Sequence, residues 1–178
     1  FGRVAALPVD MSVLQVGTYG RYDGKAFEVR GRIRREYDGG RWNEWYILYD
    51  SGEVAWLAEA MGQFSMLRQA EWPGPGIPSW NALKVGTIFT FGNLAIQAID
   101  KRPVTFVGYE GELGFAPEVG ARQLNIDFVI SDGTTGTLEY GDETDTEPDF
   151  YLGKTIPIEA LGLKNLRKLD GWKLPATV

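Results

Sequence analysis

The segment KAFEVRGRIRREY, at residues 25–37, constrains the fold more than any other part of the chain. Apolar side chains occupy odd positions and charged side chains occupy even positions. This period of two is typical of a β-strand with one buried face. The odd set is Phe27, Val29, Ile33 and Tyr37, and the even set is Glu28, Arg30, Arg32, Arg34 and Glu36. The pattern therefore predicts a half-buried strand.

A glycine turn, DGG, separates this strand from RWNEWYILY, which indicates a β-hairpin. The second strand is apolar on both faces: Trp42, Tyr46 and Leu48 share one face, and Trp45, Ile47 and Tyr49 share the other. Such a strand is usually central and covered on both sides. We therefore expect one face to pack within its own unit and the other against a second unit or a terminal segment.

Glu44 is an acid among these aromatic residues, and the hairpin offers it a partner. Depending on the loop length, either Arg35 or Arg34 lies opposite Glu44, and Tyr37 lies opposite Trp42 in the first case. Both alternatives predict a cross-strand ion pair worth about 0.2–1 kcal/mol.

Two pairs of similar segments indicate that one unit occurs twice. LQVGT at 14–18 resembles LKVGT at 83–87, and YILYDSGEVAWLAE resembles FVISDGTTGTLEY at 128–140. The proline-rich stretch EWPGPGIPSWN lies between them and suits a linker or an extended crossover. We interpret residues 14–69 and 83–140 as divergent copies.

The fold class predicted from these features is all-β, with two related small bent sheets or partly open β-barrels packed together. The predicted organisation is a first β unit with an N-terminal extension at 1–70, a crossover at 71–82 and a second β unit at 83–178. The second unit carries an acidic loop at 140–150. Helical turns are expected only near the C-terminus, where Pro157–Leu169 shows helix-like spacing of apolar residues.

Composition excludes several classes of site. The chain has no histidine and no cysteine, which excludes histidine-based nucleophile systems, zinc sites with those ligands and disulfides. The net charge of −6 argues against general nucleic-acid binding. Neither a metal nor a cofactor is expected, because no phosphate-binding loop or metal-ligand spacing is present.

Three groups of residues are candidate binding sites. Arg30, Arg32 and Arg34 alternate along one strand, so their heads would form a row suited to anionic lipid headgroups, RNA or an acidic partner; the alternative is a solvated face paired with its own glutamates. Glu110 and Glu112 project on one side of a strand. Paired carboxylates can share acid–base work or hold a cation. The third group is an aromatic wall, which packs as core or stacks on a ligand: Trp42, Trp45 and Trp56.

The sequence resembles the bacterial domain-of-unknown-function family numbered 4178. Four short motifs carry the resemblance. The matching residues are Phe27, Val29, Gly31 and Arg32, then Trp42, Glu44 and Trp45, then Trp56, Leu57 and Glu59, and finally Gly111, Glu112 and Leu113. Gly114 replaces a proline of the family pattern. The resemblance implies a cytoplasmic domain of a longer bacterial protein, associated with the membrane through partners, in a membrane-stress system.

Two functions remain as hypotheses. The first is a non-catalytic binding or scaffold module that has another protein as its partner, with at most a weak contact to an anionic membrane. The alternative is a carboxylate-based hydrolase acting on a sugar or a similar polar substrate. In that case the acid and base would come from Glu44, Glu59, Glu110 and Glu112, and the tryptophans would stack on the substrate.

Overall fold

Antiparallel β-strands make up almost all of the regular structure in the computed structural model, which describes residues 12–168. The strands are β1 (Tyr19–Tyr22), β2 (Lys25–Tyr37), β3 (Gly40–Tyr49), β4 (Val54–Ala60), β5 (Gln63–Ala70), β6 (Ile88–Phe91), β7 (Leu94–Gly111), β8 (Arg122–Ile130), β9 (Thr135–Tyr140) and β10 (Asp149–Ile156). Two 3-10 turns accompany them, η1 (Trp80–Ala82) and η2 (Ile158–Leu161). The all-β prediction is confirmed.

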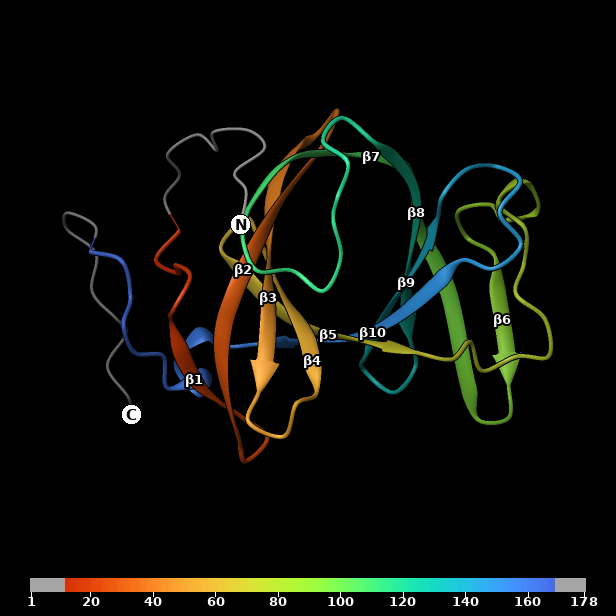
Figure 1. Cartoon of the computed structure of the whole chain (residues 1–178). Helices are drawn as coiled ribbons and strands as arrows, with labels where there is room; N and C mark the ends of the chain where they lie inside the picture. Colours follow the sequence, from red (N-terminus) through yellow and green to blue (C-terminus); the bar gives the residue numbers. More distant parts are fainter. Residues whose placement is uncertain (1–11, 169–178) are drawn as a thin grey trace.

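The sheet closes on itself into a barrel (Figure 1). Its strands follow the order β2-β3-β4-β5-β10-β9-β8-β7, and β7 pairs again with β2. The short strands β1 and β6 extend the sheet beyond this ring, on β2 and β7. The prediction of two packed sheets is therefore wrong in its finer form. The long strands β2 and β7 pair with each other, and closure removes the free edges that two separate sheets would expose.

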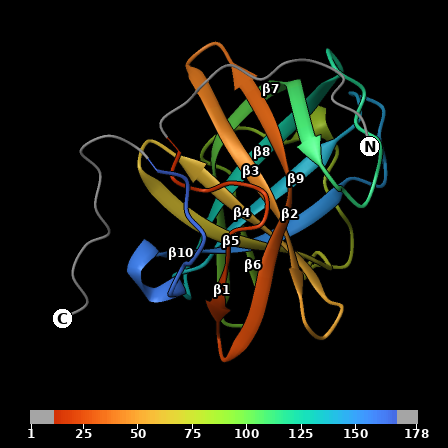
Figure 2. The ribbon, with the colours of Figure 1, turned by 60° about the vertical axis from the view of Figure 1, so that its left-hand side comes forward.

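The closing contact depends on two glycines. Gly31 on β2 lies opposite Gly111 on β7. A Cβ atom on Gly31 would lie 2.3 Å from the carbonyl oxygen of Glu112, and one on Gly111 would lie 2.4 Å from that of Arg30. Only residues without a side chain permit this approach. Figure 2 shows β2 running up the barrel to meet β7 near the top of the view.

A β-bulge in each long strand changes which face points inward. The pairing of β2 with β3 shifts between Val29 and Gly31, and that of β7 with β8 shifts between Ala98 and Asp100. Val29 and Ala98 lie in apolar cores, whereas Arg35 and Arg102, beyond the bulges, line the barrel interior. An extra residue in a strand moves the following side chains to the other face.

The first apolar core lies outside the barrel, against the outer face of strands β2 to β5. Trp45, Ile47 and Leu57 form its centre, and residues 13–14 and 161–163 cover it. One face of β3 thus packs against segments near the termini, and the other faces the barrel interior, where β8 and β9 complete the wall. The first face is thus packed as expected, whereas the second lines a cavity.

The second apolar core lies on the far side of the barrel, to the right in Figure 1. Trp72, from the crossover after β5, contacts the rings of Phe89, Phe91, Phe128 and Phe150 at centroid distances of 5.3–5.7 Å. The hydroxyl group of Tyr140 donates to the Pro78 carbonyl oxygen at 2.6 Å. The crossover at 71–82 is therefore packed against the second core.

Backbone hydrogen bonds in the two halves follow the same pattern. The Gly17 N–H donates to the Val29 carbonyl at 2.8 Å, and the Gly86 N–H donates to the Ala98 carbonyl at 2.7 Å. Asp50 donates to Ala26 as Ser131 donates to Ala95. Each VGT turn thus docks onto its long strand in the same way. The boundaries at 70 and 83 stay a prediction, and residues 1–11 and 169–178 of the predicted units lie outside the described residues.

Helical structure is confined to the two 3-10 turns. η2 falls within the predicted segment Pro157–Leu169, although Leu169 lies outside the described residues. η1 lies in the crossover, so the expectation that turns occur only near the C-terminus is wrong. The serine, asparagine and prolines of the crossover favour such a turn. Among residues 12–168 there is no helix of a length and apolar character that could cross a membrane.

Candidate functional site

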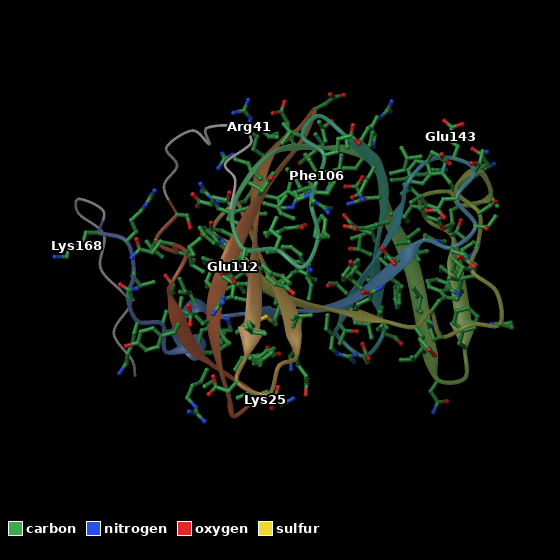
Figure 3. All side chains as sticks on the ribbon, in the orientation of Figure 1. Lys25, Arg41, Phe106, Glu112, Glu143 and Lys168 are labelled. Atoms are coloured by element: carbon green, nitrogen blue, oxygen red, sulfur yellow. The ribbon has the colours of Figure 1, made fainter. Side chains whose placement is uncertain are left out.

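A cavity of about 750 Å³ occupies the barrel interior, with residues from all eight barrel strands in its lining. Pockets for small molecules commonly have volumes of about 300–1,000 Å³. Arg41 and Phe106, two of the lining residues, lie at the upper end of the molecule in Figure 3, opposite Lys25 at the lower end. Arg41, Met61 and Phe115 are exposed members of the lining, so the cavity reaches the surface at these residues.

Arg35 is the central charge of the cavity. Its Nη1 lies 2.6 Å from Glu139 Oε1 on β9, and its Nε lies 3.3 Å from Glu44 Oε2 on β3. Its Nη2 donates to the side-chain carbonyl of Gln123 at 3.3 Å, and its guanidinium lies 4.7 Å from the ring centroid of Phe106. Arg35 is 4% exposed. This side chain therefore ties β2 to β3, β7, β8 and β9 across the interior.

The two carboxylates around Arg35 influence each other. Burial raises the pKa of Glu44, the charge of Arg35 opposes that rise, and the charge of Glu139 adds to it. Burial alone would lower the pKa of Arg35, but the charges of Glu139 and Glu44 raise it. Arg35 thus stays charged, and Glu44 holds its proton to a higher pH than an exposed glutamate.

Arg102 on β7 forms a second ionic group. Its Nη1 lies 2.5 Å from Asp100 Oδ2, and its Nη2 lies 3.3 Å from Asp127 Oδ2 on β8. The other oxygen of Asp127 accepts from the Thr137 hydroxyl at 2.9 Å. Burial raises the pKa of Asp127, while Thr137 and Arg102 lower it. The guanidinium of Arg102 also lies 4.1 Å from the ring centroid of Tyr37.

Aromatic rings form the walls between these charges. Trp42 contacts Tyr37 edge-on at 5.6 Å, and its indole Nε1 donates to Glu44 Oε1 at 3.1 Å. Trp56 contacts Tyr46 at 5.0 Å and Phe115 at 6.1 Å. Trp42 and Trp56 therefore line the cavity. Trp45 belongs to the first apolar core, and its ring lies under the guanidinium of Arg32.

The hairpin register differs from the one predicted. Tyr37 pairs with Gly40, so Arg35 lies opposite Trp42 and Ile33 lies opposite Glu44. The expectation that Arg35 or Arg34 stands directly opposite Glu44, with Tyr37 opposite Trp42, is therefore wrong. The turn is one pair tighter than assumed. An Arg35–Glu44 ion pair still forms because diagonal neighbours on one face of a sheet are within reach of long side chains.

The predicted arginine row and the Glu110–Glu112 pair meet at the seam between β2 and β7. Arg30 Nη2 lies 2.7 Å from Glu112 Oε2, and Arg32 Nε lies 2.9 Å from Glu110 Oε1. Arg32 is buried, and Arg34 donates to Asn43 Oδ1 at 3.2 Å. A hydrogen bond from Arg30 lowers the pKa of Glu112. These residues close the barrel from outside the cavity.

The acids proposed for a hydrolase do not share one site. Glu44 is in the cavity, whereas Glu59 accepts hydrogen bonds from Asn43 and Ser12 on the other face of the wall. Glu110 and Glu112 lie at the seam. Within residues 12–168, no three acidic side chains gather in a way that could hold a metal ion.

Apart from Glu44 and its partner Arg35, sequence analysis missed the main polar residues of the cavity. They are Arg102, Gln123, Asn125, Asp127, Thr137 and Glu139. The available signal was the alternation in RQLNIDFVI, where Gln123, Asn125 and Asp127 share one face of β8. A polar face of an antiparallel strand usually meets solvent. Only closure of the barrel turns this face inward.

Comparison with protein families identifies one match. A model of the family described as a domain of unknown function, DUF4178, matches residues 15–158, which is most of the chain. The chain belongs to the DUF4178 family. The resemblance found in its motifs is thus confirmed. Comparisons with curated proteins and with solved structures gave no match.

The matched region contains the whole DUF4178 cavity, whose lining runs from Arg35 to Tyr151. The family motifs also acquire positions in the barrel. Gly31, Arg32, Gly111 and Glu112 form the seam, and Trp42, Glu44 and Trp56 line the cavity. Gly114, at the position of the family proline, lies against the hydroxyl of Tyr46, where a Cβ atom would come within 2.8 Å. This DUF4178 chain therefore packs the tyrosine tightly against the β7–β8 loop.

Proposed function

We propose that this domain is a non-catalytic binding module whose ligand site is the cavity inside the barrel. The supporting observation is the cavity itself, which combines aromatic walls with buried charged groups. A polar interior of this size is costly unless its groups are paired or meet a ligand. Arg35 and Arg102 hold the walls apart while remaining paired, so the site is formed in advance of binding.

Nuclear magnetic resonance with a set of small cationic, anionic and neutral compounds tests this function. Compounds that bind should shift the indole N–H signals of Trp42 and Trp56. The Ala58→Phe variant should abolish these shifts because Ala58 lines the cavity. Val129→Phe is the matched control, since Val129 is exposed and does not line the cavity. The proposal would be contradicted if no compound of any class shifts these indole signals. It would also be contradicted if the shifts in Ala58→Phe are as large as those in the unmodified chain.

The hydrolase alternative has one observation in its favour. Glu44 and Glu139 contact the same arginine in a cavity, and burial raises the pKa of Glu44, as a general acid requires. Chromogenic glycosides provide the test. A hydrolysis rate that falls in both Glu44→Gln and Glu139→Gln, but not in the seam variant Glu112→Gln, would establish an enzyme in place of a binding module.

We also propose that the domain acts through another protein, in a cytoplasmic membrane-stress complex. Membership of the DUF4178 family supports this proposal by analogy alone. Pull-downs from the native host with the unmodified chain and with Ala58→Phe provide the test. A stoichiometric partner captured by the unmodified chain, and identified as a membrane-stress protein, is the expected result. Failure to capture such a protein under gentle conditions would count against it.

A weak contact with an anionic membrane is a lesser proposal. Arg30 is half-buried and therefore more accessible than Arg32, which is buried and paired with Glu110. Sedimentation with neutral and anionic liposomes tests it. If the domain does not bind anionic liposomes, or if Arg30→Gln binds them equally well, Arg30 acts only as a partner of Glu112.

We further infer that the two halves of the chain are divergent copies of one unit. The matching hydrogen bonds of the two VGT turns and the two long strands support this inference. An alignment of homologues provides the test. Residues 14–69 and 83–140 should resemble each other more in the family consensus than in this chain. If the consensus shows no higher similarity between them, the duplication is contradicted.

A further inference from the structure

Carboxylates outnumber arginines in the cavity. Four acids line it, Glu44, Asp127, Glu139 and Asp149, together with three arginines, of which Arg41 is held by Glu36 outside the lining. Four carboxylates therefore face two arginines. Asp100, which pairs with Arg102, adds a further negative charge at the edge of the site. The interior thus has a surplus of negative charge.

The two cavity arginines are already paired. Arg35 contacts Glu44 and Glu139, and Arg102 contacts Asp100 and Asp127. An anionic ligand would have to replace carboxylates at these arginines and would meet the surplus negative charge. A cationic ligand needs no such exchange.

Asn125 provides a second, independent indication. It is 6% exposed, lines the cavity, and its Oδ1 atom has no hydrogen-bond partner among the described residues. It lies opposite Glu139 on β9 and two residues before Asp127 on the same face of β8. A buried acceptor without a donor is costly. Its position between two acids suits a ligand that carries N–H donors.

The aromatic wall near the opening provides the third indication. Arg35 lies over Phe106, and Arg102 lies over Tyr37 and Trp42, so the cavity already stabilises cations on ring faces. Trp56 also lines the cavity, in edge contact with Phe115. No lysine or arginine lies over the Trp56 ring among residues 12–168. Tryptophan faces are the strongest aromatic partners of organic cations.

We propose that the cavity binds a small organic cation with N–H donors, of the primary-ammonium class. Its ammonium group hydrogen-bonds to Asn125 Oδ1 and lies among the surplus carboxylates, and its apolar part packs against Trp56 and Phe115. This inference rests on the proposed binding function and names the class of ligand for the same site.

Four probes of similar size separate the contributions of charge and hydrogen bonding. They are n-butylammonium, the donor-free cation n-butyltrimethylammonium, the neutral 1-pentanol and the anion butyrate. Calcium chloride at matched ionic strength serves as a metal control. Calorimetry and the Trp56 indole signal of the full chain report binding. We expect n-butylammonium to bind most tightly and n-butyltrimethylammonium to bind more weakly, with 1-pentanol, butyrate and calcium giving no shift of the indole signal.

Two variants test the named groups. Asn125→Leu, which removes the assigned acceptor, and Glu44→Gln, which removes one of the cavity carboxylates, should each weaken n-butylammonium binding roughly tenfold, the usual effect of losing an interaction with a charged group. Glu112→Gln, at the seam, should bind like the unmodified chain. Because a variant can fail to fold, the ranking of probes on the unmodified chain is decisive by itself.

The outcomes distinguish this inference from the function on which it rests. Cavity binding of butyrate or 1-pentanol as tight as that of n-butylammonium would overturn the cation proposal and leave the binding module intact. Tighter binding of calcium would also overturn it. If both variants bind n-butylammonium as tightly as the unmodified chain does, the roles assigned to Glu44 and Asn125 are wrong. Absence of cavity binding by any compound of any charge would overturn both proposals.

Discussion

Gly31 lies directly opposite Gly111 where β2 pairs with β7, and this contact closes the barrel. On either side of it, Arg30 pairs with Glu112 and Arg32 pairs with Glu110. The glycines allow the two backbones to approach, and the ion pairs fasten the strands outside the cavity. The cavity exists because this seam turns the polar faces of β8 and β9 inward.

A methyl group at position 31 should weaken the seam. In Gly31→Ala, the new Cβ would meet the Glu112 carbonyl oxygen at 2.3 Å and Leu113 Cδ2 at 2.8 Å. Overpacking of this kind costs about 1–3 kcal/mol in free energy of unfolding. Urea denaturation measures the loss. The control is Gly76→Ala, where a Cβ meets nothing within 4 Å, and equal stability of the two variants would show that the seam adapts.

Removal of Arg35 should be far more destabilising than removal of Glu44. Arg35→Met leaves Glu44 and Glu139 buried together without their cation, a change that typically costs about 3–5 kcal/mol. Glu44→Gln leaves Arg35 paired with Glu139 and should cost much less. Chemical denaturation compares the two. Arg41→Met, which breaks a surface pair with Glu36, should stay within about 1 kcal/mol of the unmodified chain. A reversed order would contradict the central role of Arg35.

Stability should fall as the pH rises through the titration of Glu44. Burial raises the pKa of Glu44 above its ordinary value of 4.5, so the folded chain binds this proton more tightly than the unfolded chain does. The contribution of Glu44 to the free energy of unfolding is therefore largest below pH 4.5 and declines until the pH exceeds the raised pKa.

Denaturation of the unmodified chain and of Glu44→Gln at a series of pH values isolates this contribution. The free energy of unfolding of the unmodified chain, minus that of Glu44→Gln, should decrease as the pH rises above 4.5. For Glu112→Gln the same difference should increase as the pH rises toward 4.5 and level off above it, because Arg30 lowers the pKa of Glu112. A difference that increases with pH for Glu44 would show that its pKa is lowered by Arg35.

Two alanines of β4 should respond differently to enlargement. Ala55 is 4% exposed in the first apolar core, whereas Ala58 lines the cavity. Ala55→Phe should cost at least about 1–3 kcal/mol because a packed core has no room for the ring. Ala58→Phe should cost less, since the ring enters the cavity. Thermal denaturation compares them, and equal losses would indicate that the interior is filled when the protein is free.

The strands themselves were predictable because their signals are local. Alternation identified β2, and the faces of β3 followed from its two apolar stripes, which the packing of Trp45 in a core and Trp42 in the cavity confirms. The glycine turns marked the hairpins. The family followed from short motifs, and the family model confirms it. The register of the first hairpin was predicted incorrectly, because DGG is compatible with more than one turn length.

By itself, therefore, the sequence determined an all-β chain, its main strands and the two faces of β3. Tertiary structure alone decided that the strands form one barrel, because closure depends on the pairing of Gly31 with Gly111, far apart in the chain. It also decided the site. The bulges after Val29 and Ala98 turn Arg35 and Arg102 inward, and closure brings Glu139 and Asn125 to face them. A polar strand face has the same sequence pattern whether it meets solvent or a cavity, and only the position of the other strands distinguishes the two.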